Sequence, residues 1–372
     1  MVSAVLRSPF TFRCSVSPHA FMVQSQAILV RIMASFIVSG LMHELIYFAS
    51  NLGGHLFTLV IGEDNIRWRP PHRPVSGLAF GNVTGVHVHV RAISESFFLT
   101  WLANFKLLLF AFDQEPLSPL PSIFSRFLCF TCFPIKTKQN PSSNRIYNKP
   151  KWVLAFKVIL FSSLLHLYGK NYHNTLPRLA FLSIFTIHVY IELEFILVLV
   201  GGLLSTLLGC EIEPVFNEPY LATSFQDFWS RRWNRMVPSV LRPTIHIPVQ
   251  RFTAQLIGQN ASFYAGMLAT FIVSGLMHEL VYFYIIRKSP TWEVTCFFVL
   301  HGVVTCLEVA VKRMRLCPSP HRVVSSLAVV AFMFVTSVWL FAPQLLRYNV
   351  HKRLISECLF VIDVVKAICF AS

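Results

Sequence analysis

Residues 323–342 read V-V-S-S-L-A-V-V-A-F-M-F-V-T-S-V-W-L-F-A, an apolar stretch without a single charged side chain. A helix of about 20 such residues is long enough to cross the ~30 Å hydrocarbon core of a bilayer. Lipid offers no hydrogen bonds to the backbone, so spanning segments of this kind are helical. Comparable stretches lie at 27–48, 93–112, 152–168, 179–209, 263–286 and 292–311. The sequence therefore predicts an all-α, polytopic membrane protein with about seven transmembrane helices.

The composition agrees with this prediction. Hydrophobic residues make up 54% of the 372 residues and charged residues only 13%, about half the usual charged share of a soluble domain. The net charge is +15, with basic residues clustered at 136–151, 231–251 and 312–322. Such clusters are typical of cytoplasmic loops, although they could also neutralise a polyanionic ligand such as a nucleotide phosphate. No basic helix or nucleic-acid-binding module accompanies the charge, so a nucleic-acid partner is not expected.

The nine cysteines are scattered and odd in number. Cys129 and Cys132 form one C-x-x-C pair, but no second pair completes a zinc site. We therefore expect free, buried thiols and neither a metal site nor a disulfide framework. The first thirty residues show no clear signal peptide, because Arg31 interrupts the short apolar run at 26–30. The first spanning helix is expected to direct insertion.

One motif occurs twice. A-S-F-I-V-S-G-L-M-H-E-L-I-Y-F at 34–48 returns as A-T-F-I-V-S-G-L-M-H-E-L-V-Y-F at 269–283, with thirteen of fifteen positions identical. A match of this length indicates a duplication. The two copies differ in what precedes them, because only the second follows the polar and aromatic segment N-E-P-Y-L-A-T-S-F-Q-D-F-W-S-R-R-W-N at 217–234. The copy with His278 is therefore the candidate site, and the copy with His43 is interpreted as a fragment.

If 263–286 is a helix, His278 shares a face with Ser274, Gly275 and Tyr282. Ionisable side chains within a membrane usually face the bundle interior or a wet cavity, because their charged forms are costly in lipid. His278 is therefore expected on an interior face. Taken alone, it could equally be a neutral histidine bonded to a backbone carbonyl of a neighbouring helix.

Three other ionisable residues in spans are interpreted as structural. Glu279 follows His278 by one position and points about 100° away from it on the helix. His188 and Glu192 are four residues apart in the span 179–209, and we interpret them as an interior pair with its bonds satisfied, not as a proton route.

The segment 217–234 is too polar to span a membrane and too aromatic for a solvated loop. Amphipathic aromatic side chains favour the membrane interface. We expect the segment to lie at the interface or to re-enter the bundle, and an interfacial connecting helix is the simpler alternative.

The run at 219–234, followed by V-S-G-L-M-H-E-L at 273–280, resembles the plant wax synthase family, acyl-CoA:long-chain-alcohol acyltransferases within the membrane-bound O-acyltransferase superfamily. Further runs that carry the resemblance are F-F-L-T-W-L-A-N-F-K-L-L-L-F-A-F-D at 97–113 and P-T-W-E-V-T-C-F-F-V-L-H-G-V at 290–303. It covers 93–372, with the core motifs at 216–303. Residues 1–92 depart from the pattern, because a partial copy of the catalytic-helix motif stands where the family has membrane helices. We interpret residues 1–92 as an atypical segment that comes from a partial tandem copy fused to the acyltransferase-like part of the chain.

The resemblance implies a membrane-bound O-acyltransferase-like bundle in the endoplasmic reticulum membrane. Its substrates would be fatty acyl-CoA and a long-chain alcohol, with membrane lipid around it and no cofactor or metal. His278 matches the catalytic histidine, and Asn234 belongs to the D-x-W-x-N type signature. The predicted substrate-binding residues are Asp227, Trp229, Arg231, Arg232, Trp233, Ser274 and Tyr282.

A neutral imidazole at position 278 could take the proton of an attacking alcohol, and the amide of Asn234 could stabilise the oxyanion, orient His278 or orient the alcohol. Arg231, Arg232 or Arg235 could bind the phosphates of acyl-CoA. Three alternatives stay open from the sequence: a sterol as the acceptor, an inactive fusion product, and a membrane carrier. The repeat is local and its two copies have unequal surroundings. This argues against a carrier, since carriers are commonly built from paired halves.

Overall fold

The computed structural model describes residues 101–112, 114–117, 124–137, 151–169, 176–286, 288–315 and 321–370. The described part of the chain is helical. It contains no sheet, and an isolated bridge joins Thr137 to Ile212. The all-α prediction is confirmed for these residues. The duplicated segment 34–48 and the whole of 1–92 lie outside them.

Four helical stretches in the described part are long and apolar enough to cross a membrane: Arg178–Leu208, Met236–Ile286, Glu293–Met314 and Arg322–Arg347. They account for the predicted spans 179–209, 263–286, 292–311 and 323–342. The predicted span 152–168 is helix α5 (Lys151–Gly169), which is apolar but shorter. The described part of 93–112 contains only the short helix α3 (Ala103–Ala111). Four spans, and not seven, are therefore established among the described residues.

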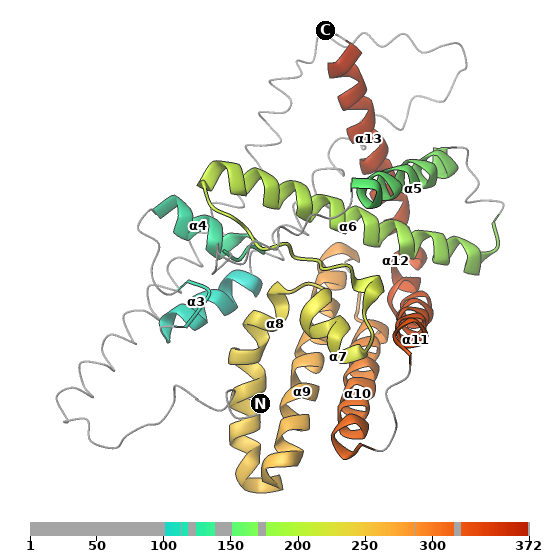
Figure 1. Cartoon of the computed structure of the whole chain (residues 1–372). Coiled ribbons are helices and arrows are strands. Elements are labelled where there is room, and N and C mark those ends of the chain that lie inside the picture. The colour runs from blue at the N-terminus through green and yellow to red at the C-terminus, as the bar shows by residue number, and fades with distance from the viewer. Residues whose placement is uncertain are drawn as a thin grey trace.

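The long helices lie in two groups (Figure 1). α8 (Met236–Leu241), α9 (Ile247–Ile286), α10 (Glu293–Met314) and α11 (Arg322–Thr336) form one bundle. α6 (Arg178–Leu208) and α5 cross above it, and α13 (Val350–Phe370) rises from that end after the short α12 (Pro343–Arg347).

α9 is a helical hairpin. Gly258 has φ 79° and ψ 164°, a conformation that interrupts the helix and that only glycine adopts readily. The chain reverses there, and its two limbs run side by side (Figure 1). Gly266 on the second limb meets the first so closely that a Cβ at that position would lie 2.6 Å from the carbonyl oxygen of His246. The interpretation of 231–251 as a basic loop was therefore wrong for most of its length, because residues 236–257 form the first limb of this hairpin.

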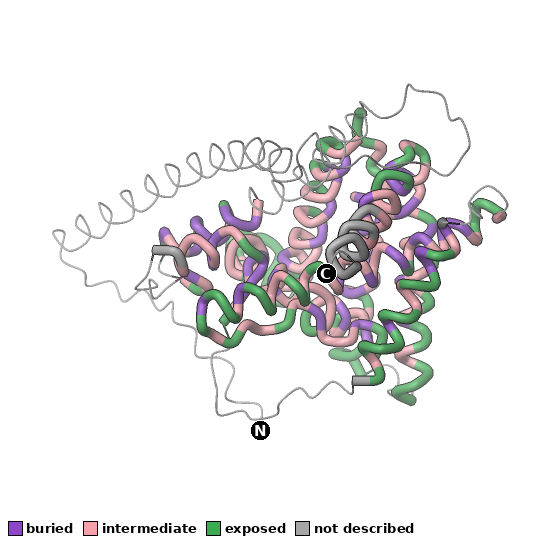
Figure 2. Tube along the Cα trace, turned by 90° about the horizontal axis from the view of Figure 1, so that it is seen from above, coloured by how far each residue is buried: buried purple, intermediate pink, exposed green. Residues whose placement is uncertain are grey.

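The burial pattern suits a bilayer. Leu199, Leu203 and Leu207, spaced four residues apart on α6, are 72%, 60% and 70% exposed. In contrast, His188 and Glu194 on the same helix are buried. Figure 2 shows exposed positions along the outer sides of the helices and buried ones where helices meet. Apolar side chains outside and polar groups inside are the arrangement expected of an integral membrane protein.

Buried lysines tie the outer helices to one another. Lys157 of α5 donates to both carboxylate oxygens of Glu194 on α6, at 2.7 and 2.8 Å. Lys106 of α3 does not reach toward the membrane surface. Its side chain is fully buried, and Nζ donates to the carbonyl oxygens of Phe130 and Phe133 at the C-terminal end of α4 (Phe124–Cys132). Helix C-termini leave carbonyl groups unpaired, and a cation there satisfies them.

Candidate active site

The polar and aromatic segment is folded tightly against the bundle. Ser224 accepts a hydrogen bond from the backbone N–H of Asp227 at 3.0 Å and so caps the single turn of α7 (Phe225–Asp227). A π-helical turn follows at Phe228–Arg232. Such turns are rare and are frequent at functional sites. The backbone N–H of Gln226 also donates to Glu308 of α10, at 3.0 Å, so the segment is fastened to the bundle.

A cavity of about 490 Å³ opens between this segment and the two limbs of the α9 hairpin. Six of the nine residues predicted from the sequence line it: Trp229, Arg231, Trp233, Asn234, Ser274 and His278. They come from two stretches about forty residues apart in sequence. The fold therefore brings the segment 217–234 and the helix of His278 to one cavity.

His278 has one ring nitrogen fixed and one free. Nδ1 lies 2.7 Å from the carbonyl oxygen of Ser274, one turn earlier in α9. A carbonyl only accepts, so Nδ1 carries the proton in this contact and Nε2 of the neutral ring keeps its lone pair. Within the described residues Nε2 has no hydrogen-bond partner. The ring is held against Phe298 of α10, with centroids 4.4 Å apart. This geometry leaves a proton acceptor on the cavity wall.

Close packing of α9 on α10 fixes the position of this histidine. A Cβ at Gly275 would lie 3.0 Å from the Cα of Thr295, and a Cβ at Gly302 would lie 2.9 Å from the Cβ of Phe271. Glu279 accepts a hydrogen bond from the backbone N–H of Thr295 at 3.2 Å. It thereby satisfies one of the unpaired N–H groups at the start of α10. This contact agrees with the structural role expected of Glu279.

Asn234 lies where the segment turns into α8. Its backbone has φ 33°, a left-handed conformation that asparagine tolerates better than most residues. Its Oδ1 is buried and has no hydrogen-bond partner among the described residues. A strained backbone and an unpaired polar atom at one residue are both costly, and they coincide here at a residue that lines the same cavity as His278.

The other three predicted residues do not line the cavity, and each is used within the protein. Asp227 accepts a hydrogen bond from Nε of Arg232 at 2.6 Å. Arg232 also donates to the carbonyl oxygens of Asn217 and Glu218. The hydroxyl of Tyr282 donates to the carbonyl oxygen of Phe341 at 2.9 Å. In this arrangement these three side chains stabilise the structure around the cavity and do not reach the cavity interior.

The structure adds residues that sequence reasoning missed. Arg242, His246, Phe271 and Phe298 also line the cavity. Phe271 lies seven residues before His278 and therefore on the same helix face, so its spacing could have revealed it. Arg242 and His246 belong to the first limb of the hairpin, which was read as a loop, and no local signal marked them.

The described residues thus form an integral membrane helical bundle with a free imidazole nitrogen and an asparagine on one aromatic cavity. Residues 212–300 match the model of the membrane bound O-acyl transferase family. Over 281 residues the chain is 72% identical to probable long-chain-alcohol O-fatty-acyltransferase 2 of Arabidopsis thaliana, covering 75% of this chain and 82% of that protein. It is 60% identical over 284 residues to probable long-chain-alcohol O-fatty-acyltransferase 1 of the same plant, with the same coverage. The chain belongs to the wax synthase family of membrane-bound O-acyltransferases.

Proposed function

We propose that this protein transfers a fatty acyl group from acyl-CoA to a long-chain alcohol and so forms a wax ester. The observation that carries the proposal is the free Nε2 of His278 on the cavity wall, with Nδ1 held by the Ser274 carbonyl. The names of the relatives support a long-chain alcohol as the acyl acceptor, since they describe long-chain-alcohol O-fatty-acyltransferases.

In the proposed reaction Nε2 of His278 takes the hydroxyl proton of the alcohol as its oxygen attacks the thioester carbonyl carbon. General base catalysis of this kind contributes roughly 10²–10⁴-fold. The tetrahedral intermediate then collapses, the C–S bond breaks, and the imidazolium returns the proton to the CoA thiolate. No acyl-enzyme, cofactor or metal is needed in this sequence of steps.

The amide of Asn234 is proposed to stabilise the developing oxyanion or to hold the attacking hydroxyl. Its place on the cavity that His278 also lines supports either role. The aromatic wall supports the choice of alcohol over water. Trp229 packs on Phe271 and Phe298 with centroids 5.6 and 5.8 Å apart, and a wall of this kind favours an alkyl chain and disfavours water.

The phosphates of acyl-CoA are assigned to Arg231 and Arg242. Arg232 is paired with Asp227, and Arg235 with Glu213. Arg231 and Arg242 line the cavity, are exposed, and have no ion pair with any described residue. Free guanidinium groups are well suited to bidentate phosphate binding.

The test is the activity of the full chain in membranes from a yeast strain that lacks its own neutral-lipid acyltransferases. Membranes receive labelled acyl-CoA with either a long-chain alcohol or a sterol. We expect wax ester from the wild type and from His43→Ala, and none from His278→Ala. Formation of steryl ester alone would show that the acceptor is a sterol and not a long-chain alcohol. Product that depends on His43 but not on His278 would contradict the assignment of the active site to His278.

We place the enzyme in the endoplasmic reticulum membrane. A fluorescently tagged full chain, viewed beside an endoplasmic reticulum marker in plant cells, tests this placement. Signal confined to the plasma membrane or to plastids would contradict it.

A further inference from the structure

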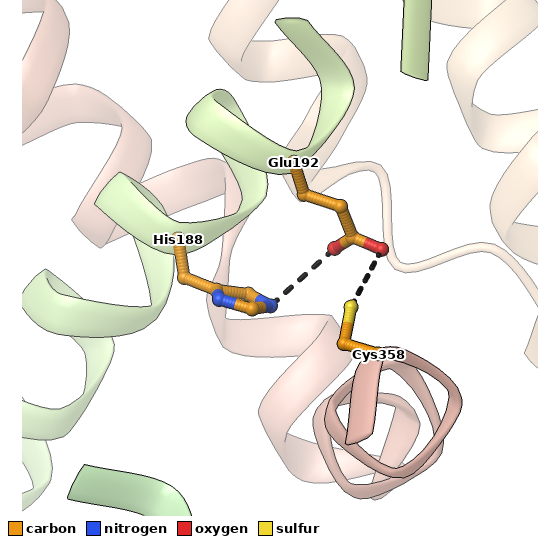
Figure 3. Close-up of side chains that lie close together, drawn as sticks. All are labelled: His188, Glu192 and Cys358. Carbon is orange, nitrogen blue, oxygen red and sulfur yellow. Dashed lines mark hydrogen bonds and ion pairs between the residues drawn. The ribbon is translucent and has the colours of Figure 1, made fainter. Parts of the chain in front are cut away.

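Three potential metal ligands meet outside the cavity, where α13 crosses α6. His188 and Glu192 project from neighbouring turns of α6, and Cys358 points at them from α13 (Figure 3). Nε2 of His188 lies 3.4 Å from Oε2 of Glu192, and Sγ of Cys358 lies 3.2 Å from Oε1 of the same carboxylate. The ligand atoms of all three lie within 4.8 Å of one another.

His188 is the unexplained member of this cluster. Its side chain is completely buried, and neither ring nitrogen has a hydrogen-bond partner among the described residues. Its ring stacks on Phe161 at 5.3 Å and meets Tyr168 edge-on at 5.3 Å. Buried polar groups are nearly always satisfied, so an unpaired imidazole in an aromatic pocket requires a reason. The interior pair expected from the sequence is present as a contact, but its hydrogen bonds are not satisfied.

The separations match the spacing of ligands around one tetrahedral zinc ion. With zinc bonds of about 2.0–2.3 Å to nitrogen, oxygen and sulfur, two ligand atoms lie roughly 3.4–3.6 Å apart. The nitrogen–oxygen and sulfur–oxygen distances of 3.4 and 3.2 Å are already close to these values. The two distances are to different oxygens of the Glu192 carboxylate, and the nitrogen and sulfur atoms, at most 4.8 Å apart, need to draw together around an ion.

The charges also balance. A carboxylate and a thiolate carry two negative charges and the imidazole is neutral, so a divalent cation leaves the site with no net charge. Such a balance matters in a bundle core, where an uncompensated charge is strongly unfavourable. A mixed set of thiolate, imidazole and carboxylate suits Zn²⁺, whereas Ca²⁺ and Mg²⁺ prefer oxygen ligands alone.

We propose that His188, Glu192 and Cys358 form a structural zinc site that fastens α13 to α6. The Glu192 side chain is 16% exposed. A water molecule would complete the four ligands, and Tyr168, whose ring meets His188 edge-on at 5.3 Å, has a buried hydroxyl without a hydrogen-bond partner among the described residues. None of the three protein ligands lines the cavity of His278, so the site is independent of the proposed acyl transfer.

The test is the metal content of the full chain, purified in detergent with a tag that contains neither histidine nor cysteine. Elemental analysis should give about one zinc per chain for the wild type. Cys358→Ser and His188→Ala should bind zinc at least ~100-fold more weakly, since even outer-shell changes typically cost 10–100-fold. The matched control is Cys296→Ser, which removes an exposed free thiol on α10 and should keep the full zinc content.

Replacement of zinc by Co²⁺ gives a second measurement. The wild type and Cys296→Ser should show a thiolate-to-cobalt charge-transfer band, and Cys358→Ser should not. If Cys358→Ser fails to fold, X-ray absorption of the wild type decides, since one sulfur ligand supports the site and a shell of nitrogen and oxygen alone overturns it. A wild-type chain that binds neither zinc nor cobalt, or a Cys358→Ser chain that binds them equally, also overturns it.

Discussion

The proton-accepting nitrogen of His278 depends on a backbone carbonyl and not on a side chain. The carbonyl oxygen of Ser274 holds Nδ1 at 2.7 Å, and any residue at position 274 of a helix would supply that oxygen. The hydroxyl of Ser274 is therefore free to serve the cavity. For this reason the loss of the Asn234 amide should change kcat, whereas the loss of the Ser274 hydroxyl should change KM.

Asn234→Ala should lower kcat by about 10²–10³-fold, the usual effect of losing one oxyanion donor. Ser274→Ala is the matched control, because it removes a polar group from the same cavity while the carbonyl that fixes His278 remains. Its effect should fall on KM. The measurement is steady-state kinetics with varied alcohol. A kcat for Asn234→Ala equal to that of Ser274→Ala would show that Asn234 has no direct role in the reaction.

Arg231→Gln and Arg242→Gln should each raise the KM for acyl-CoA by about 10-fold or more at unchanged kcat. A hydrogen bond to a charged group contributes about 1.5–3 kcal/mol. Both phosphate contacts would form when acyl-CoA binds and would stay the same during acyl transfer, so their loss should affect KM and not kcat. Arg353→Gln, an exposed arginine on α13, controls for net charge. Raised salt should weaken acyl-CoA binding to the wild type more than to either cavity variant. Equal KM values for all three variants would contradict the assignment.

At the scale of elements, length and hydropathy predicted some helices well and others not at all. α6, α10 and α11 were predicted because each is a long apolar run. The first limb of α9 was not predicted, because its arginines and prolines resemble a loop and its turn rests on Gly258 alone. His188 and Glu192 were visible as a pair four residues apart. Cys358 was not, since it lies 166 residues further on and only the crossing of α13 over α6 brings it near.

Gly266→Ala should separate the two limbs of the α9 hairpin. The new Cβ would lie 2.6 Å from the His246 carbonyl oxygen, which belongs to the backbone and cannot rotate away. Overpacking of this kind typically costs 1–3 kcal/mol. It should lower both the thermal stability in detergent and kcat/KM, because His246 and Met267 line the cavity.

Gly201→Ala on α6 is the control for this change. No atom lies within 4 Å of a Cβ at that position, and alanine is about 1 kcal/mol more favourable than glycine within a helix. Gly201→Ala should therefore keep the activity and the stability of the wild type or raise the stability slightly. A Gly266→Ala chain that behaves like Gly201→Ala would show that the two limbs need not touch.

At the scale of the whole molecule, the chemistry is concentrated in a small part of the chain. Among the described residues, those that line the cavity fall between Gln226 and Thr305, and the family match covers 212–300. The surrounding helices that fix these walls belong to the described bundle from residue 101 onward. The duplicated motif at 34–48 adds a second histidine but has no counterpart of the segment 217–234. We therefore expect the proposed reaction to need nothing from the first 92 residues.

Deletion of residues 1–92 should leave wax ester formation no lower than in the full chain. The physical reason is that His278, Asn234, both cavity arginines and the hairpin that holds them all lie in 93–372. The two chains should be compared in the same membranes at matched protein level, with His278→Ala in the shortened chain as the inactive control. Activity that appears only after deletion would mean that the atypical segment is inhibitory. Full activity that disappears on deletion would instead show that the repeat at 34–48 has become a working part of the bundle, and His43→Ala in the full chain would then separate a role of its imidazole from a role in packing.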